Sequence, residues 1–402
     1  MATASTVSHK RRTPRAFSAF AETGHSYRAK YYKQVQKDAR EKFTQEISFR
    51  SKDKDISPAK ALLHVATEDE AFMAFNREMD AYSIQNETKS TSLSSESLES
   101  TYGAMPFPLA GKNMNEWMSE FDAIADEVEA ELISRETRRN LVEVLDAVNT
   151  VLFKSRGFKR SSVPMDSKCS YLHSVLSSGY CSAILLSVVY IEVCRRLNVT
   201  ILGSRIGEDF LIWPQTRNPE ELFKITSCHS LFGIVNGKCA NDPRTKASDI
   251  DSSSLSGLEI ATIRDIIGIA LANLIRLHWK CASRSNHGLM LTSHLRSSGS
   301  FSKNDSSNVH LLRPQDLRLA IMASERLLIL QPHNWSLRRD HGMMLYYSRE
   351  YEEAVKELSI CMAFAPEEES EILEVFVEKL HYLCVESSWN KSLGHKGHLS
   401  IP

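Results

Sequence analysis

The sequence lacks the features that would mark three common classes of protein. Its eight cysteines form no Cys-x-x-Cys pair, which argues against a zinc site of the usual spacing. No stretch approaches the ~20 consecutive apolar residues needed to span a bilayer, and the N-terminus has no apolar secretory run. The net charge is only −1, so no overall field attracts the chain to nucleic acid or to a membrane. We therefore expect free thiols in a reducing compartment, with no bound metal or cofactor.

The chain contains enough apolar residues to form hydrophobic cores. The hydrophobic fraction is 42% and the charged fraction 25%, both ordinary for a globular protein, and 402 residues predict two or three domains. The charge is unevenly placed. The first fifty residues are basic, whereas acids gather later, as in "APEEESE".

The first segment, residues 1–26, is predicted to be a disordered basic N-terminus. It is rich in Ser, Thr and Arg and contains no acid before Glu22. This composition suits an organelle transit peptide, and the alternative is a plain basic tail on a cytoplasmic protein. A nucleic-acid-binding arm is a third interpretation, which we consider unlikely because no aromatic ladder or known motif accompanies the charge.

Composition and apolar spacing divide the rest of the chain. Apolar residues recur every three to four positions in most of it, which predicts helices, and two Ser-rich stretches lack any such period. The expected segments are an N-terminal helical part of the core (27–83), a Ser/Thr-rich linker (84–112), the core itself (113–290), a loop (291–313), C-terminal helices (314–388) and a disordered tail (389–402).

Two segments within the core differ in composition from the helical segments around them. "VTILGSRIGEDFLIWP" and "LFKITSCHSLFGIVNGKCANDP" are β-branched and aromatic runs interrupted by Gly, Pro and Asn. They predict short strands with turns at Gly207, Pro214 and Asn236-Gly237. A small antiparallel sheet is therefore expected inside a mostly helical protein.

The C-terminal third carries a repeat. Ala320 and Ala354 lie 34 residues apart, as do Pro332 and Pro366, and Gly342 lies twelve residues before Ala354. This period, with small residues where two helices touch and a proline at the turn, is typical of tetratricopeptide units. The segment "ESEILEVFVEKLHYL" is expected to be the capping helix that covers the last apolar face. Such helices indicate contact with a protein partner.

Cys181 is the residue on which a catalytic function would depend. It follows Gly179-Tyr180 and precedes an apolar helical segment, and a cysteine at a helix N-terminus is favoured as the reactive thiolate. A nucleophile also needs a base and an orienting group, which His229 and Asp242 could supply from the downstream strands. The alternative interpretation is a buried structural thiol beside a surface histidine and a turn aspartate.

Three stretches carry a resemblance to a known family. "CSYLHSVLSSGYCSAILLSVVYIEVCRRLNV", the preceding "LDAVNTVLFKSRGFKRSSVPMDSKCSYL" and the later "LRRDHGMMLYYSREYEEAVKELSICMAFAP" resemble the SirB-type transglutaminase-like family. The resemblance implies an α+β, mostly helical protein with a papain/transglutaminase-like core followed by tetratricopeptide helical hairpins. In active enzymes of this kind the core carries a Cys–His–Asp triad. The basic, Ser-rich start resembles plant members, which implies a chloroplast address.

The chain departs from the family pattern where catalysis needs it. Aligned without gaps, the family's nucleophile position falls on Ala183, and Cys181 is turned by about 200° on a helix relative to it. Asp209 stands where the family has its histidine, whereas Asp242-Pro243 retains the family's Asp-Pro step. We therefore favour a non-catalytic scaffold that binds a protein partner. The alternative is a cysteine-dependent hydrolase or acyltransferase acting on peptide amides.

One further residue stands out in the apolar segment that follows Cys181. Glu192 lies among apolar neighbours, and a lone buried carboxylate is costly. We expect it to pair with an arginine such as Arg264.

Overall fold

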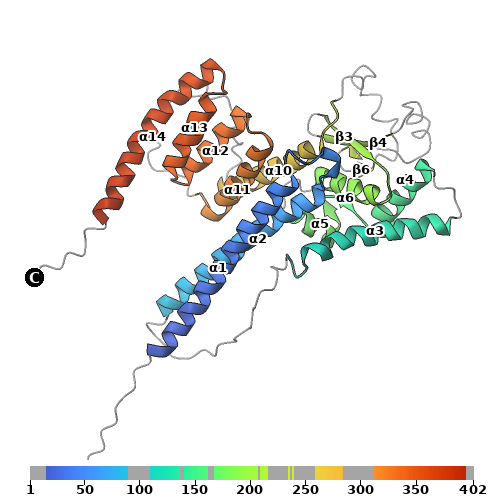
Figure 1. Cartoon of the computed structure of the whole chain (residues 1–402), viewed down its shortest axis with the longest axis horizontal. Helices are drawn as coiled ribbons and strands as arrows, with labels where there is room; N and C mark the ends of the chain where they lie inside the picture. The colour runs from blue at the N-terminus through green and yellow to red at the C-terminus, as the bar shows by residue number, and fades with distance from the viewer. Residues whose placement is uncertain are drawn as a thin grey trace, which may run out of the picture.

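The computed structural model is mostly helical, with a few short strands near its middle (Figure 1). It describes residues 15–88, 109–135, 140–161, 167–206, 209–215, 234–235, 238–239, 259–283 and 312–394. This confirms the expected fold class.

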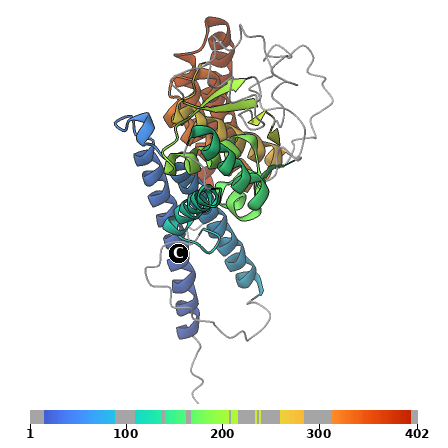
Figure 2. The same ribbon diagram turned by 90° about the vertical axis from the view of Figure 1, so that its right-hand side faces the viewer.

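A long antiparallel helical hairpin forms the N-terminal part. It consists of α1 (Arg15–Glu46) and α2 (Pro58–Thr88), which lie side by side in Figures 1 and 2 and extend away from the rest of the molecule. Phe43 and Leu63 are fully buried where the hairpin joins the core. α1 begins before residue 27 and α2 ends after residue 83, so the hairpin is longer than predicted. Once a helix has nucleated, each added residue contributes one more backbone hydrogen bond, and the helix can continue past the residues with a clear apolar period.

The central part packs three helices around a fourth, α6. They are α3 (Met114–Ser134), α4 (Leu141–Asn149, continued by a π-helical turn at Thr150–Ser155), α5 (Leu172–Ser178) and α6 (Ala183–Arg196). Asn113 begins α3 with a capping box, in which its side chain accepts from the Glu116 N–H while the Glu116 carboxylate accepts from the Asn113 N–H. α6 is buried from Ile184 to Cys194, which makes it the central element of this part.

The strands within the described ranges form three separate two-stranded pairs. Their bounds are β1 (Lys159–Arg160), β2 (Tyr180–Cys181), β3 (Ile201–Ile206), β4 (Asp209–Pro214), β5 (Ile234–Val235) and β6 (Lys238–Cys239). β3–β4 and β5–β6 are antiparallel, which confirms the predicted strands, whereas β1–β2 is parallel. The predicted turns at Gly207 and Asn236-Gly237 lie outside the described residues. The antiparallel content is thus divided between two hairpins and does not form one sheet.

Five helices follow the strands in the part of the chain that the structure describes. They are α10 (Ile263–Ser283), α11 (Pro314–Leu330), α12 (Trp335–Tyr347), α13 (Tyr351–Met362) and α14 (Glu367–Gly394). Each packs antiparallel against the next, and the two alanines of the 34-residue offset, Ala320 and Ala354, are completely buried. α14 extends to Gly394, past the predicted boundary at residue 388.

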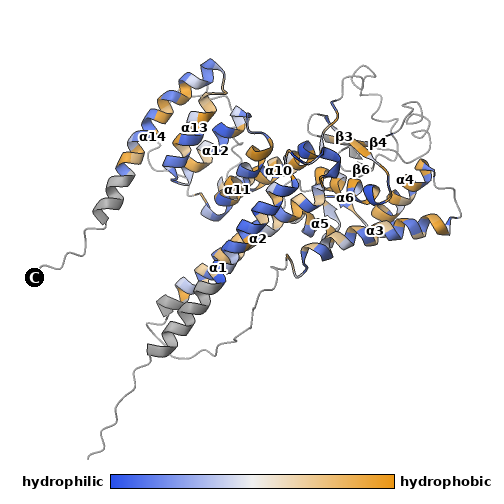
Figure 3. Ribbon diagram, viewed as in Figure 1, coloured by the Kyte–Doolittle hydropathy of each residue, from blue (hydrophilic) through white to orange (hydrophobic). Residues whose placement is uncertain are grey.

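α10 belongs to both halves of the molecule. The sequence placed it in the core, and it does contact α2 and α6. It also forms the most extensive helix pair of the C-terminal half with α11, and the Arg313 N–H donates to the Ala282 carbonyl at 3.1 Å. One apolar cluster therefore runs without interruption from Phe43 on α1 to Leu380 on α14. Figure 3 shows apolar residues concentrated where these helices meet. Among the helices that the structure describes, none is both long and apolar enough to cross a bilayer.

We expect Gly342→Ala to lower the free energy of unfolding. A Cβ at this position of α12 would lie 2.7 Å from both Cγ and Cδ2 of Leu358, a fully buried side chain on α13. Such overpacking costs about 1–3 kcal/mol, which exceeds the ~1 kcal/mol gained in helix propensity. The control is Gly268→Ala, where the nearest atom, Leu327 Cδ1, is 3.3 Å away. Urea unfolding should show the larger loss at Gly342; equal or higher stability would contradict the close approach.

Candidate functional site

Cys181 lies on β2 and not on the helix that follows it. α6 begins at Ala183, after Ser182 as its N-cap, so the thiol is outside the first turn. β2 pairs with β1 in parallel, and the Ser161 N–H donates to the Cys181 carbonyl at 2.9 Å. Gly179, at φ +72°, makes the turn that leads into the strand. The segment around Cys181 is thus held by backbone hydrogen bonds on both sides.

The Cys181 thiol is fully buried. Its Sγ lies 3.6 Å from the carbonyl oxygen of Gly179, to which it can donate a weak hydrogen bond. Burial, with a smaller contribution from the neighbouring Cys169, raises the pKa of the Cys181 thiol well above its usual range. A raised pKa keeps the sulfur as the neutral thiol, which is neither the nucleophile nor the metal-binding form.

The two predicted partners of Cys181, His229 and Asp242, lie outside the described residues. The catalytic triad therefore stays a prediction. Asp209, which stands at the family's histidine position, begins β4 and pairs with Ile206 of β3. Ala183 is half-buried at the start of α6. Within the described part of the chain, no group of three or more His, Cys, Asp or Glu residues is placed to hold a metal ion.

Glu192, on α6, is completely buried and is satisfied by four groups. Ser57 Oγ donates to its carboxylate at 2.5 Å, the Ala59 N–H at 3.3 Å and Arg196 Nη1 at 3.0 Å, while Arg195 lies 3.8 Å away. The expected arginine pairing is confirmed, but not with Arg264.

Arg264 binds a different group of acceptors. It donates to the Ser48 carbonyl at 2.7 Å and lies 3.5 Å from Asp53. The two arginines at the end of α6 reach Glu192 because side chains three and four residues apart share one face of a helix.

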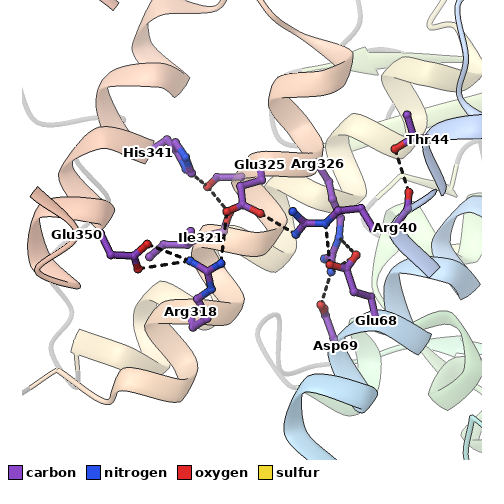
Figure 4. A network of polar contacts seen from close by, with 11 residues as sticks. Arg40, Thr44, Glu68, Asp69, Arg318, Ile321, Glu325, Arg326, His341 and Glu350 are labelled. Carbon is purple, nitrogen blue, oxygen red and sulfur yellow. Dashed lines mark hydrogen bonds and ion pairs between the residues drawn. The ribbon is translucent and has the colours of Figure 1, made fainter. Parts of the chain in front are cut away.

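A second buried ionic cluster joins the C-terminal helices to the N-terminal hairpin. Arg326, on α11, has no exposed surface, and its guanidinium donates to Glu68 at 2.9 Å and to Asp69 at 2.6 Å, both on α2 (Figure 4). Arg40 on α1 donates to Glu68 at 2.8 Å and lies 2.6 Å from Glu325. Burial alone lowers the pKa of Arg326, but the two carboxylates more than offset this and raise it, so Arg326 is held as a cation.

Asp69 extends this cluster into the core. The Tyr171 hydroxyl, just before α5, donates to Asp69 at 2.8 Å and lies 2.8 Å from His278 Nε2 on α10. Because the tyrosine has a single proton, His278 must be the tautomer that donates from Nε2. Burial lowers the pKa of His278, which keeps the ring neutral. These residues are buried, so we interpret the cluster as the joint between the two halves of the protein and not as a substrate site.

Sequence reasoning missed this joint although a signal for it exists. "HVATEDEAF" places Glu68 and Asp69 on α2 among residues that otherwise repeat with an apolar helical period, and "ASERLLIL" places Arg326 in a similar run. Buried charges are rare unless they are paired. The same criterion identified Glu192, and it would have identified these residues too.

The comparisons with known proteins agree with this architecture. A family model described as "Transglutaminase-like superfamily" matches residues 115–236, from the start of α3 to just beyond β5. A model described as "Tetratricopeptide repeat" matches residues 308–375, which include α11, α12, α13 and the first part of α14. No curated protein matches the chain. The chain therefore carries a transglutaminase-like domain followed by a tetratricopeptide repeat.

Proposed function

We propose that this protein is a non-catalytic scaffold, in which a transglutaminase-like core supports tetratricopeptide helices that bind a protein partner. The observation that carries the proposal is the state of Cys181. Its thiol is buried, its pKa is raised by that burial, and it precedes the first turn of α6. The repeat itself supports a role in protein–protein contact.

The second candidate is a cysteine-dependent hydrolase or acyltransferase acting on peptide amides. It is favoured by one observation: Cys181 is held at the turn leading into α6, inside the stretch that matches the transglutaminase-like model. This function needs His229 and Asp242 within hydrogen-bond reach of the thiol and of each other. It also needs a movement that exposes the sulfur.

Thiol labelling separates the two functions. We expect iodoacetamide at neutral pH to modify Cys181 on the order of 100-fold more slowly in the native chain than in the denatured one, because a buried neutral thiol reacts only after local opening. Cys384, half-buried on α14, is the internal reference and should react earlier. Peptide mass spectrometry at successive times reports both residues. Rapid, selective labelling of Cys181 together with amide turnover would establish the enzyme and end the scaffold proposal.

We further propose that the protein is a SirB-type member from a plant and that it is directed to the chloroplast, with the cytoplasm as the alternative. The block "LSVVYIEVCRRL" supports the subfamily, and the basic, Ser/Thr-rich start without an acid before Glu22 supports the address. Fusion of residues 1–50 to a fluorescent protein tests the address in plant cells. A diffuse cytoplasmic signal would exclude it.

A further inference from the structure

α14 is the last helix of the C-terminal array, and the described residues cover only one of its sides. Figure 1 shows it at the edge of the molecule beyond α13. Its inner side presents Leu373, Val377 and Leu380, which are 2%, 6% and 0% exposed. This part of the sequence prediction is confirmed, since α14 does cap the last apolar face of the repeat. A capping helix of this kind is expected to have a polar outer side.

The outer side of α14 is not purely polar. Ile372, Val375, Tyr382 and Val385 are 44%, 53%, 77% and 51% exposed. Their spacing of three, seven and three residues places them on one side of the helix. Single exposed apolar residues are ordinary, but four on one side of one helix form a stripe of the kind that marks an interaction surface. Figure 3 shows apolar positions among polar ones along the coloured part of this helix.

The stripe is surrounded by acids. α14 contains seven glutamates against two lysines. Four of the glutamates, Glu371, Glu374, Glu378 and Glu386, are exposed beside the apolar stripe. Among the ion pairs of the described residues none involves these four, whereas Glu369 lies 3.8 Å from Arg339. The outer side of α14 therefore combines apolar surface with an excess of negative charge, four glutamates against the exposed Lys379.

We propose that the outer side of α14 docks a basic amphipathic helix of a partner protein, an inference that rests on the proposed scaffold function and names the chemistry of its partner. The apolar stripe at helical spacing fits the apolar side of another helix, laid along it as in helix–helix packing. The glutamates favour lysines and arginines along the edges of that helix. A second copy of α14 is disfavoured by the same charges, because two such surfaces would repel each other.

Binding of a defined probe to the full-length protein tests this surface. The probe is a fluorescent helical peptide of about 20 residues built from leucine and lysine, with leucine at every third or fourth position. Two control peptides have the same leucine pattern with glutamate in place of lysine, and the same composition with the pattern scrambled. We expect anisotropy to show binding of the first peptide only, weakening as salt rises.

Variants locate the binding. Val375→Ser with Tyr382→Ser should weaken the probe's affinity by about tenfold or more, since both side chains would lose buried apolar area. Glu374→Lys with Glu378→Lys should weaken it by a similar factor and remove most of the salt dependence. Both pairs are exposed, so circular dichroism should show an unchanged fold. The matched control is Ile133→Ser on α3, an apolar residue that is 71% exposed and should leave affinity unchanged.

Equal affinity for all of these variants, or equal binding of the glutamate peptide, would overturn the proposal. A concentration-dependent dimer in sedimentation that disappears in the Val375/Tyr382 variant would also overturn it, in favour of a second copy on this surface. The thiol-labelling experiment is independent of these readouts. Rapid labelling of Cys181 would end the scaffold function without changing the binding of the peptide. Absence of peptide binding would leave the measured labelling rate of Cys181 unchanged.

Discussion

Arg326→Met is expected to lower the free energy of unfolding by about 3–5 kcal/mol, because it leaves Glu68 and Asp69 buried without their shared cation. The two carboxylates are 3% and 2% exposed, and Arg326 is fully buried. Arg40 would still contact Glu68, but it is on the surface side of the cluster and does not reach Asp69. Urea unfolding followed by circular dichroism measures the loss.

Two controls show whether the loss of stability comes from burying carboxylates without a counter-charge. Adding Glu68→Gln and Asp69→Asn to Arg326→Met should restore part of the stability, since the remaining buried groups are then neutral. Lys356→Ala breaks an exposed pair with Glu353 on α13 and should leave stability almost unchanged. A loss below about 1 kcal/mol for Arg326→Met would mean that the cluster is not a joint.

This joint also determines how the C-terminal helices can be studied. A chain cut before α11 would lose Arg326, which leaves Glu68 with Arg40 as its cation and Asp69 in the core with none. Loss of a binding partner after such a cut would then report damage to the core as much as loss of the repeat. Surface variants in the intact chain avoid this problem.

Acidification from about pH 6.5 to pH 4 is expected to destabilise the protein through buried histidines. Burial, and to a lesser extent Lys42 and Lys60, lowers the pKa of His64 to about 4, and burial lowers that of His173 to about 4. In this range the unfolded chain takes up protons on both residues and the native chain does not, so stability falls as pH falls. Each histidine contributes roughly 3 kcal/mol across the window.

One buried carboxyl group acts in the opposite direction. Burial raises the pKa of Asp340 on α12 to about 6, despite the neighbouring Arg339. Here the native state binds the proton more readily than the unfolded chain, so stability rises as pH falls from about 6 to 4, by roughly 3 kcal/mol. The two histidines together outweigh Asp340, and His278 and His341, whose pKa values burial also lowers, add to the loss.

Chemical unfolding at a series of pH values tests these signs. The double variant His64→Leu, His173→Leu should show a much flatter dependence between pH 6.5 and pH 4, and Asp340→Asn a steeper one. An unchanged slope in the double histidine variant would mean that these rings are not buried as the fold places them.

Local pattern was sufficient to predict most of the helical architecture. The 34-residue offset of Ala320 and Ala354 placed the repeat correctly, because small residues are required wherever two helices approach closely. The β-branched and aromatic runs bounded by Gly, Pro and Asn predicted β3, β4, β5 and β6, since side chains of these kinds favour the extended backbone of a strand. Helix ends were less accurate, and α14 and α1 both run past the positions where the apolar period fades.

The burial of Cys181 at the candidate site depends on contacts between segments distant in sequence, which no local sequence pattern contains. The sequence pattern of a cysteine just before an apolar helix is the same whether the thiol is exposed or buried. The outcome depends on how β1 and Cys169 pack around β2, and this burial raises the thiol's pKa. Glu192 differs in this respect, because its arginine partners lie three and four residues further along α6, a spacing that the sequence does contain.

By itself the sequence determined the periodic elements of this protein: amphipathic helices, short hairpins and a tetratricopeptide repeat. These follow from residues a few positions apart, which share a helix face or a turn whatever the rest of the chain does. Only the tertiary structure brought Arg326 to Asp69, 257 residues away, and buried Cys181 as a neutral thiol. Both results require separate helices to dock, and the cost of burying a charge or a thiolate is set by the surroundings that docking creates.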